Sequence, residues 1–265
     1  LAAMKRIEST KNSTIKKLQV YIEKSRDRKR DNVFVVEGIR ENQRALLSGF
    51  EPEWIFYDEN HHNQNDIIVS LEGRSPIIHE CTAEVFSKIA LRSGVPNWVG
   101  LYRRKDSTLD DVNWSRDPLV VVLEAIEKPG NLGAILRSAS AAKVDAVLLA
   151  DSVVDVYHPQ AIRNSLGGFF DVPILSGTSP EIIDLLKSKQ IPLMVTTLEG
   201  ATPHYEVNLK NGCAVVMGAE DQGVTQTWLE NADERIKIPM GGVVDSLNVS
   251  VAAAVMLFEA NRQRA

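Results

Sequence analysis

The sequence predicts an α/β protein with two domains, the second of which contains a parallel sheet. Short apolar segments alternate with segments of helical periodicity along most of the chain. A polar stretch at 103–118 lacks this periodicity and is long for a loop inside one domain, which indicates a domain boundary. Near the C-terminus, apolar segments at 213–217 and 235–238 each run into a glycine-containing polar loop. We therefore expect a first domain at 4–105, a linker at 106–118 and a second domain at 119–265.

Length and composition are typical of a globular protein with one large domain or two ordinary ones. The chain has 265 residues, of which 44% are hydrophobic and 25% are charged. No apolar run approaches the roughly 20 residues that a membrane-spanning helix needs, and we see no secretory signal. The cysteines, Cys81 and Cys213, are too far apart in sequence to indicate a disulfide framework or a metal site. We expect a cytoplasmic protein that has no membrane partner and binds no metal.

The first domain alternates strand and helix signals. Asn12 and Ser13 begin a helix whose apolar residues recur at helical spacing to Ile22. The charged segment SRDRKRDN at 25–32 breaks this pattern, so we expect the helix to end before it. The remaining strands are expected at 32–38, 53–57, 76–79 and 97–102. The remaining helices are expected at 39–47, 63–71 and 82–89.

Positive charge is concentrated at the N-terminus, although the net charge of the chain is −5. The first 30 residues contain ten Lys and Arg residues and only three acidic residues. A local basic block can bind phosphates whatever the net charge of the whole chain. The same charges can also form the solvated face of a helix, and charge alone leaves both interpretations open. The candidate RNA-binding residues are Arg26, Arg28, Lys29 and Arg30.

The second domain begins with LVVVLEAI at 119–126, a nearly continuous apolar run that is typical of a parallel strand buried on both faces. Further strands are expected at 145–150, 172–175 and 191–196, with helices at 158–166 and 179–187. Ser179 is the expected N-cap of the latter helix, with Pro180 at its first position. The last helix is rich in small residues and apolar on almost every face, which predicts burial, including burial against a second subunit.

The loop PGNLG at 129–133 lies between a strand and a helix, where phosphates bind. If the helix starts near Leu132, Asn131 is its N-cap and Arg137 lies one to two turns further. An amide and a guanidinium at this edge of the sheet suit a phosphate. The simpler interpretation is that Asn131 only caps the helix and that Arg137 is solvated.

Two further loops carry candidate residues. In GAEDQG at 218–223, Glu220 is a candidate polar anchor and the glycines allow the backbone to approach a ligand, although an ordinary turn explains the pattern as well. In IPMGGVVDSLNVSVA at 238–252, Ser246 and Asn248 either lie at a ligand or cap the last helix. Because the carboxyl ends of parallel strands meet at one edge of a sheet, we expect these loops to gather there.

Together and in this order, the segments PGNLGAILR (129–137), VVMGAEDQGV (215–224) and IPMGGVVDSLNVSVAAA (238–254) resemble the motifs of the SpoU family of the SPOUT superfamily. The resemblance implies an S-adenosyl-L-methionine-dependent RNA ribose 2′-O-methyltransferase. It also implies a deep trefoil knot in the second domain and a homodimer with its site at the subunit interface. The N-terminal part resembles an L30e-like domain, similar to a small RNA-binding protein of the large ribosomal subunit. Ribosomal RNA is therefore the first expected substrate, and transfer RNA is the second.

The resemblance also assigns site residues by position. It places Asn131 and Arg137 at the target ribose and its phosphate, and Glu220, Ser246 and Asn248 at the reacting centre. The expected cofactor contacts are Gly218, Ala219, Glu220, Ile238, Met240, Ser246, Leu247 and Asn248. A non-catalytic RNA-binding module is one alternative, and the joint presence of Asn131, Arg137, Glu220, Ser246 and Asn248 argues against it. A nicotinamide-dependent dehydrogenase is another, but the loop at 129–133 lacks the G-x-G-x-x-G pattern.

Overall fold

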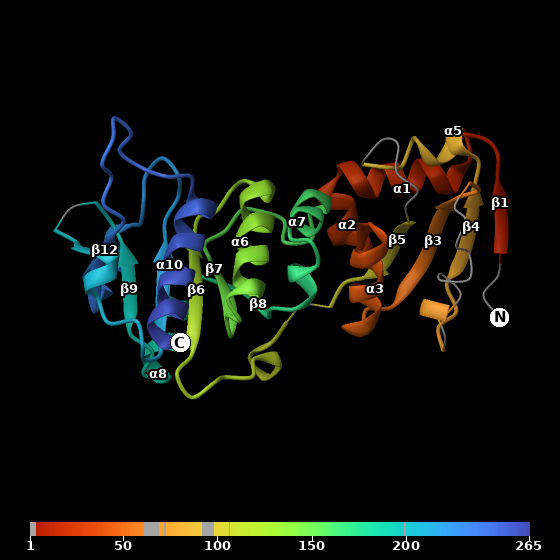
Figure 1. Ribbon diagram of the computed structural model, residues 1–265. Helices are drawn as coiled ribbons and strands as arrows, with labels where there is room; N and C mark the ends of the chain where they lie inside the picture. The colour runs from red at the N-terminus through yellow and green to blue at the C-terminus, as the bar shows by residue number, and fades with distance from the viewer. Residues whose placement is uncertain (1–3, 61–68, 72, 92–97, 106, 199) are drawn as a thin grey trace. The chain divides into compact units, whose positions relative to one another are not determined.

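The structure is a computed structural model that describes residues 4–60, 69–71, 73–91, 98–105, 107–198 and 200–265 (Figure 1). Its contacts divide the chain into two compact units, Leu1–Lys105 with Asp155–Phe170, and Asp106–Val154 with Asp171–Ala265. The helix expected at 63–71 falls mostly outside the described residues. In the described parts, every helix is too short or too polar to cross a lipid bilayer.

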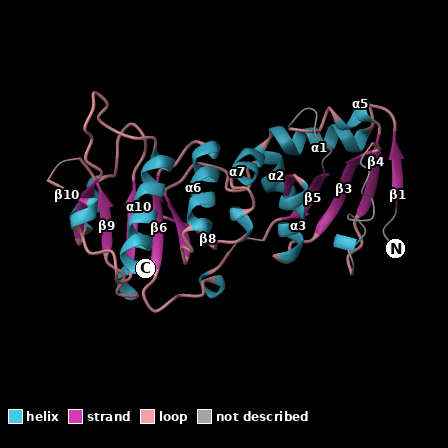
Figure 2. Ribbon diagram, in the orientation of Figure 1, coloured by secondary structure: helices cyan, strands magenta, loops and turns pink. Residues whose placement is uncertain are grey.

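The first unit contains a mixed five-stranded sheet in the order β1-β4-β3-β5-β2 (Figure 2). Strands β1 and β3 pair in parallel with β4, whereas β5 pairs antiparallel with β3 and β2. The strands are Met4–Ile7 (β1), Val33–Glu37 (β2), Pro52–Asp58 (β3), Ile77–Cys81 (β4) and Trp98–Arg103 (β5). The helices are Ser13–Glu23 (α1), Ser25–Asp31 (α2), Ile39–Leu47 (α3), Ala83–Phe86 (α5), Pro159–Asn164 (α7) and the 3₁₀ turn Gly168–Phe170 (η2).

The N-terminal helices confirm one expectation and correct another. Asn12 caps α1 by accepting a 2.8 Å hydrogen bond from the backbone of Thr14, as the start signal predicts. The charged segment after α1 does not end the helical structure, because it forms α2. Within α2, Arg28 points inward and forms a 2.6 Å ion pair with Asp155, and the pair lowers the pKa of Asp155. This buried contact stabilises a helix that local charge alone argues against.

A segment from the second half of the sequence completes the first unit. Residues 155–170 pack against β2 through aromatic rings. The ring of Phe34 lies 4.7 Å from that of Tyr157 and 6.3 Å from that of Phe169, measured between centroids. Arg28 donates from its guanidinium to Asp155 and to the carbonyl of Tyr21. The apolar character of β2 therefore reflects contacts with a segment more than a hundred residues away.

The second unit contains an all-parallel sheet of seven strands in the order β10-β12-β9-β11-β6-β7-β8, as the apolar runs predict. Its central strands β6 and β11 are buried along their whole length. The strands are Leu119–Glu124 (β6), Ala146–Ala150 (β7), Ile174–Gly177 (β8), Leu193–Thr196 (β9), Thr202–Pro203 (β10), Cys213–Met217 (β11) and Glu234–Lys237 (β12). The helices are Pro129–Ala141 (α6), Ser179–Ser188 (α8), Gln226–Asn231 (α9), Val249–Arg264 (α10) and the 3₁₀ turns Leu109–Asp111 (η1) and His204–Glu206 (η3).

Two helix starts in this unit differ from expectation. Helix α6 begins at Pro129 with Lys128 as N-cap, so Asn131 lies inside the first turn and does not cap the helix. Proline is favoured at this position because its φ is fixed and it needs no hydrogen-bond acceptor. Helix α8 is capped by Thr178 in a capping box with Glu181. Ser179 is instead buried, and its backbone and hydroxyl donate to Asp151.

The last helix, α10, packs on α6, and the two lie side by side in Figure 1. Asn248 caps it by accepting from the backbone of Ser250 at 3.0 Å, one of the two roles that the sequence leaves open. The face toward α6 is buried, but Val251 and Phe258 are 49% and 51% exposed. The expectation of burial on almost every face is therefore met on one side only within a single chain.

Candidate active site

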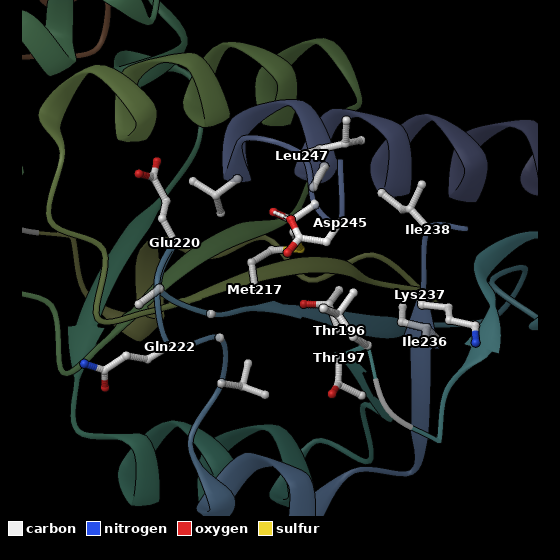
Figure 3. A pocket seen from close by; sticks show the side chains of 18 of the residues that line it. Thr196, Thr197, Met217, Glu220, Gln222, Ile236, Lys237, Ile238, Asp245 and Leu247 are labelled. Carbon is white, nitrogen blue, oxygen red and sulfur yellow. Dashed lines mark hydrogen bonds between the residues drawn. The ribbon is translucent and has the colours of Figure 1, made fainter. Parts of the chain in front are cut away.

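The parallel sheet brings the loops after β9, β11 and β12 to one edge, where they surround a cavity of about 650 Å³. Figure 3 shows side chains of Thr196, Met217, Ile238 and Leu247 around this cavity. Thr196 is held at the end of β9 by a 2.8 Å hydrogen bond from its hydroxyl to the carbonyl of Val216. The two glycine loops therefore gather at one site, as expected from the sequence.

The loop after β11 is closed upon itself. Ala219 and Gly223 exchange two backbone hydrogen bonds of 3.0 Å, which makes a tight hairpin around Glu220. Gly223 has a φ of +67°, a conformation that favours glycine. At Gly218, a Cβ atom would lie 2.1 Å from the backbone carbon of Gly223. A side chain at position 218 is therefore incompatible with the closed loop.

The carboxylate of Glu220 joins three segments of the chain. It accepts hydrogen bonds from the amine of Lys128 and from the amide of Asn131, both at the start of α6. It also accepts from the Asn248 amide at 3.3 Å, and that amide lies 3.3 Å from the Asn131 oxygen. The hydrogen bond and charge of Glu220 raise the pKa of Lys128. Asn131, Glu220 and Asn248, proposed from separate loops, thus lie in one polar cluster.

A second cavity of about 340 Å³ borders the first. It is lined by 125–128 and Asn131 on one side and by 218–221 on the other. Because 218–221 also line the larger cavity, Glu220 lies between the two spaces. The arrangement provides two adjacent spaces with shared polar groups, as a two-substrate transfer reaction requires.

Most of the remaining candidate residues line the larger cavity, but Arg137 does not. The cofactor candidates that line the larger cavity are Gly218, Ala219, Glu220, Ile238, Met240, Ser246 and Leu247. Asn248 borders it through its contact with Glu220. Arg137 is exposed on α6 and lines neither cavity. Its side chain has no hydrogen bond or ion pair among the parts of the chain that the structure describes, so its guanidinium is available to a ligand.

The basic candidates of α2 divide by burial. Arg26 is exposed over 85% of its side chain, Arg30 over 61%, and Lys29 is also exposed. Arg28 is fully buried, and Asp155 and two backbone carbonyls occupy its guanidinium. Arg28 therefore has a structural role in this fold and does not face a ligand.

Several residues in or near the site were not predicted from the sequence. Thr196 and Thr197 line the larger cavity, but their relevance depends on β9 lying between β11 and β12 in the sheet. Lys128 reaches Glu220 across 92 residues of sequence. Glu124 lines neither cavity, but it precedes the segment 125–128 and leaves a detectable signal in the sequence, because a single carboxylate ends an otherwise apolar strand.

Comparison with protein families assigns both parts of the chain. The family model described as the SpoU rRNA Methylase family matches residues 118–258, which include all three loops of the site. A second model, the MRM3-like substrate binding domain, matches residues 12–99. The first match covers the whole seven-stranded sheet, and the second covers strands β2, β3 and β4 of the five-stranded sheet.

Similar proteins cover nearly the whole chain. A solved structure described as an RNA 2′-O ribose methyltransferase is 39% identical, with a TM-score of 0.86 over 98% of this chain and 99% of that one. The SpoU methyltransferase AviRb of Streptomyces viridochromogenes, solved with the cofactor AdoMet, is 26% identical, with a TM-score of 0.86 over 96% and 98% of the two chains. The 23S rRNA (guanosine(2553)-2′-O)-methyltransferase RlmP of Bacillus subtilis (strain 168) is 28% identical over 96% of this chain and 98% of its own.

Replacement of Gly218 tests the closed loop. We expect Gly218→Ala to lower the free energy of unfolding by roughly 1–3 kcal/mol, because the new methyl group meets backbone that cannot move aside. Gly242→Ala is the matched control, since a Cβ there meets open space. Thermal and urea melting of both variants measures the difference. Equal stability of the two variants would contradict the closed geometry of the loop.

Proposed function

This chain belongs to the SpoU rRNA methylase family, and we propose that it transfers a methyl group from S-adenosylmethionine to a ribose 2′-hydroxyl of 23S ribosomal RNA. The observation that carries the proposal is the convergence of Asn131, Glu220 and Asn248 between two adjacent cavities. Relatives named as 23S rRNA 2′-O-methyltransferases support the choice of substrate. Mapping ribose methylation on ribosomal RNA from cells with and without this gene tests it.

The larger cavity fits S-adenosylmethionine in size and lining. Its volume of about 650 Å³ lies within the range of ordinary cofactor pockets. Apolar side chains such as Met217 and Ile238 suit a nucleobase, and the backbone of 218–223 offers polar groups at close approach. Solved relatives carry this cofactor. When bound, the sulfonium supplies an electrophilic methyl group, so the protein mainly has to orient the reactants.

The smaller cavity is the proposed place of the target ribose. Asn131 lines it, and its amide is fixed by Glu220. Arg137 is proposed to hold the neighbouring phosphate with its planar fork of donors. A guanidinium offers hydrogen-bond donors and no acceptor, so Arg137 is unsuited to take up the proton of the hydroxyl. The proton of the 2′-hydroxyl is then expected to leave to phosphate or water.

Substitution of Arg137 separates catalysis from cofactor binding. We expect Arg137→Ala to reduce methyl transfer at least 100-fold, because the target phosphate loses its partner, while S-adenosylmethionine still binds. Arg262→Ala, at the far end of α10, is the control and is expected to keep full activity. Methyl transfer to ribosomal RNA and calorimetric titration of the cofactor are the measurements. A folded Arg137→Ala protein that no longer binds the cofactor would contradict this role.

The first unit is proposed to bind RNA through the exposed cations of α2. Arg26, Lys29 and Arg30 face solvent, and the unit matches a substrate-binding family model. Ribosomal RNA is favoured over transfer RNA because relatives of this chain are named as 23S rRNA methyltransferases. Because the named relatives come from bacteria, in which ribosomal RNA is made in the cytoplasm, we propose a cytoplasmic location for this protein.

The salt dependence of RNA binding tests the role of α2. For the double variant Arg26→Gln, Lys29→Gln we expect weaker binding and a log–log salt slope reduced by about 1.5, since each lost phosphate contact removes roughly 0.7–0.9. The control is the double variant Lys187→Gln, Lys210→Gln. It removes two exposed cations at the amino-terminal edge of the second sheet, away from the edge that carries the two cavities. Fluorescence anisotropy between 50 and 200 mM salt, roughly the range where such slopes are resolved, gives both values. Identical slopes for all proteins would exclude α2 as a phosphate-binding surface.

We further propose that the protein is a homodimer and that its second unit contains the trefoil knot expected of the family. The exposed apolar face of α10 supports the dimer. Val251 and Phe258 lie on this face, and the residues that pack on α6 lie on another. Leu247, which lines the cavity, and Val244 in the same loop are also exposed and apolar. A second copy covering this face would also cover the rim of the cofactor site.

Charge on the exposed face of α10 tests the dimer. We expect Val251→Glu, Phe258→Glu to yield monomers, because burying two carboxylates in an apolar interface is costly. Leu47→Glu, which replaces an apolar side chain 87% exposed on α3, is the control and should leave the assembly unchanged. Analytical ultracentrifugation measures the masses. A monomeric unaltered protein, or a dimeric double variant, would contradict the proposed interface.

A further inference from the structure

Glu124 is the last residue of β6 and ends the apolar run LVVVL with a carboxylate. The residue is 3% exposed. One carboxylate oxygen accepts from the backbone N–H of Thr225 at 2.8 Å, and the other accepts from the Thr225 hydroxyl at 2.7 Å. Burial of a carboxylate is costly unless its oxygens are hydrogen-bonded, so this pair defines where Thr225 lies.

Both partners adjoin loops of the site. Ala125, which follows Glu124, has a φ of +51° and begins the segment 125–128 that lines the smaller cavity. Thr225 directly follows Val224, the end of the loop that lines the larger cavity. The two residues are 101 positions apart in sequence. Their hydrogen bonds therefore connect the first loop of the site to the second.

The loop at 218–224 depends on this connection at one of its ends. At its start it continues from β11, which is paired on both sides within the sheet. At its end Thr225 is the N-cap residue of α9, whose buried Trp228 donates from its indole N–H to the Ser179 hydroxyl at 3.0 Å. The hairpin at 219–223 is closed by its own hydrogen bonds, and only Val224 lies between it and Thr225. A shift of Thr225 would therefore also shift Glu220.

We infer that Glu124 is a positioning residue for cofactor binding, because it fixes through Thr225 the loop that carries Glu220 and the backbone of 218–223. The inference rests on the proposed function of the larger cavity. Glu124 lines neither cavity, so its effect on a ligand is indirect. Its removal is expected to weaken cofactor binding and to leave RNA binding by the first unit unchanged.

Two substitutions of Glu124 separate hydrogen bonding from side-chain shape. Glu124→Met keeps the length of the side chain but leaves both Thr225 donors without an acceptor, so we expect the Kd for S-adenosylmethionine to rise about tenfold. Glu124→Gln is expected to bind nearly as well as the unaltered protein. Its amide oxygen accepts from the backbone N–H, and its NH₂ donates to the Thr225 hydroxyl, which can turn to accept.

Substitutions of Thr225 test the same contact from the side of its donors. Thr225→Ser keeps both donors and should bind normally. Thr225→Val removes the hydroxyl, and combined with Glu124→Gln it leaves the NH₂ unpaired. Thr225→Val alone already leaves one oxygen of the buried Glu124 carboxylate without its donor, so we expect the double variant to lose less affinity than the product of the two single losses.

Asp145→Asn is the matched control, since Asp145 also accepts two backbone hydrogen bonds, from Ser115 and Leu119, but at the amino-terminal edge of the sheet. It should lower the melting temperature without changing the Kd for the cofactor. Calorimetry with S-adenosylmethionine, well below the melting temperature of each variant, gives the values. Normal binding by folded Glu124→Met, or additive losses in the double variant, would overturn the inference. If the unaltered protein bound no S-adenosylmethionine, the proposed function would fail, and the inference with it.

Discussion

The carboxylate of Glu220 is the interaction on which the site depends, because side chains from distant segments converge on it. Lys128 and Asn131 reach it from the start of α6, and Asn248 reaches it from the start of α10. Asn248 also caps α10 with its side-chain oxygen, so the amide that contacts Glu220 is held in place by the helix itself. The position of one acceptor therefore coordinates two helix termini and the loop after β11.

The parallel sheet is the reason that these groups can meet. Parallel strands require crossover connections, which place every carboxyl end at the same edge. The polar residues that follow β6, β9, β11 and β12 consequently share one side of the unit, although they are spread over more than a hundred residues. Within that arrangement, tight backbone geometry at Gly218 and the pairing of Glu124 with Thr225 determine how closely the loops approach. The geometry of the site is thus determined by backbone contacts between the loops as much as by its polar side chains.

The elements that could be predicted from the sequence are those that leave a local or periodic pattern of apolar residues. The apolar run of β11 and the amphipathic helix α3 occur at the expected residues, because a buried strand and an amphipathic helix each leave a direct pattern in the sequence. The three loops of the site were also predictable, since each follows a strand and carries glycine with a polar side chain. Their convergence is confirmed for Asn131, Glu220 and Asn248.

The features that could not be predicted depend on distant partners or weak patterns. Helix α2 forms in a charged segment because the buried side chain of Arg28 pairs with Asp155, 127 residues away in sequence. The strand β1 has only four residues, three of them exposed, and is defined by its pairing with β4. The start of α6 at Pro129 placed Asn131 within the helix, and the contact of Lys128 with Glu220 follows from tertiary structure alone. Local propensity carries no information about such pairs.

The most direct test of the central claim is a crystal structure of the protein grown with S-adenosylmethionine. The account predicts the nucleoside in the larger cavity, against the backbone of 218–223 and the loop at 238–247, with its methyl group directed toward Asn131 in the smaller cavity. A structure with the cofactor bound elsewhere, or with its methyl group directed away from the cluster around Glu220, would contradict it.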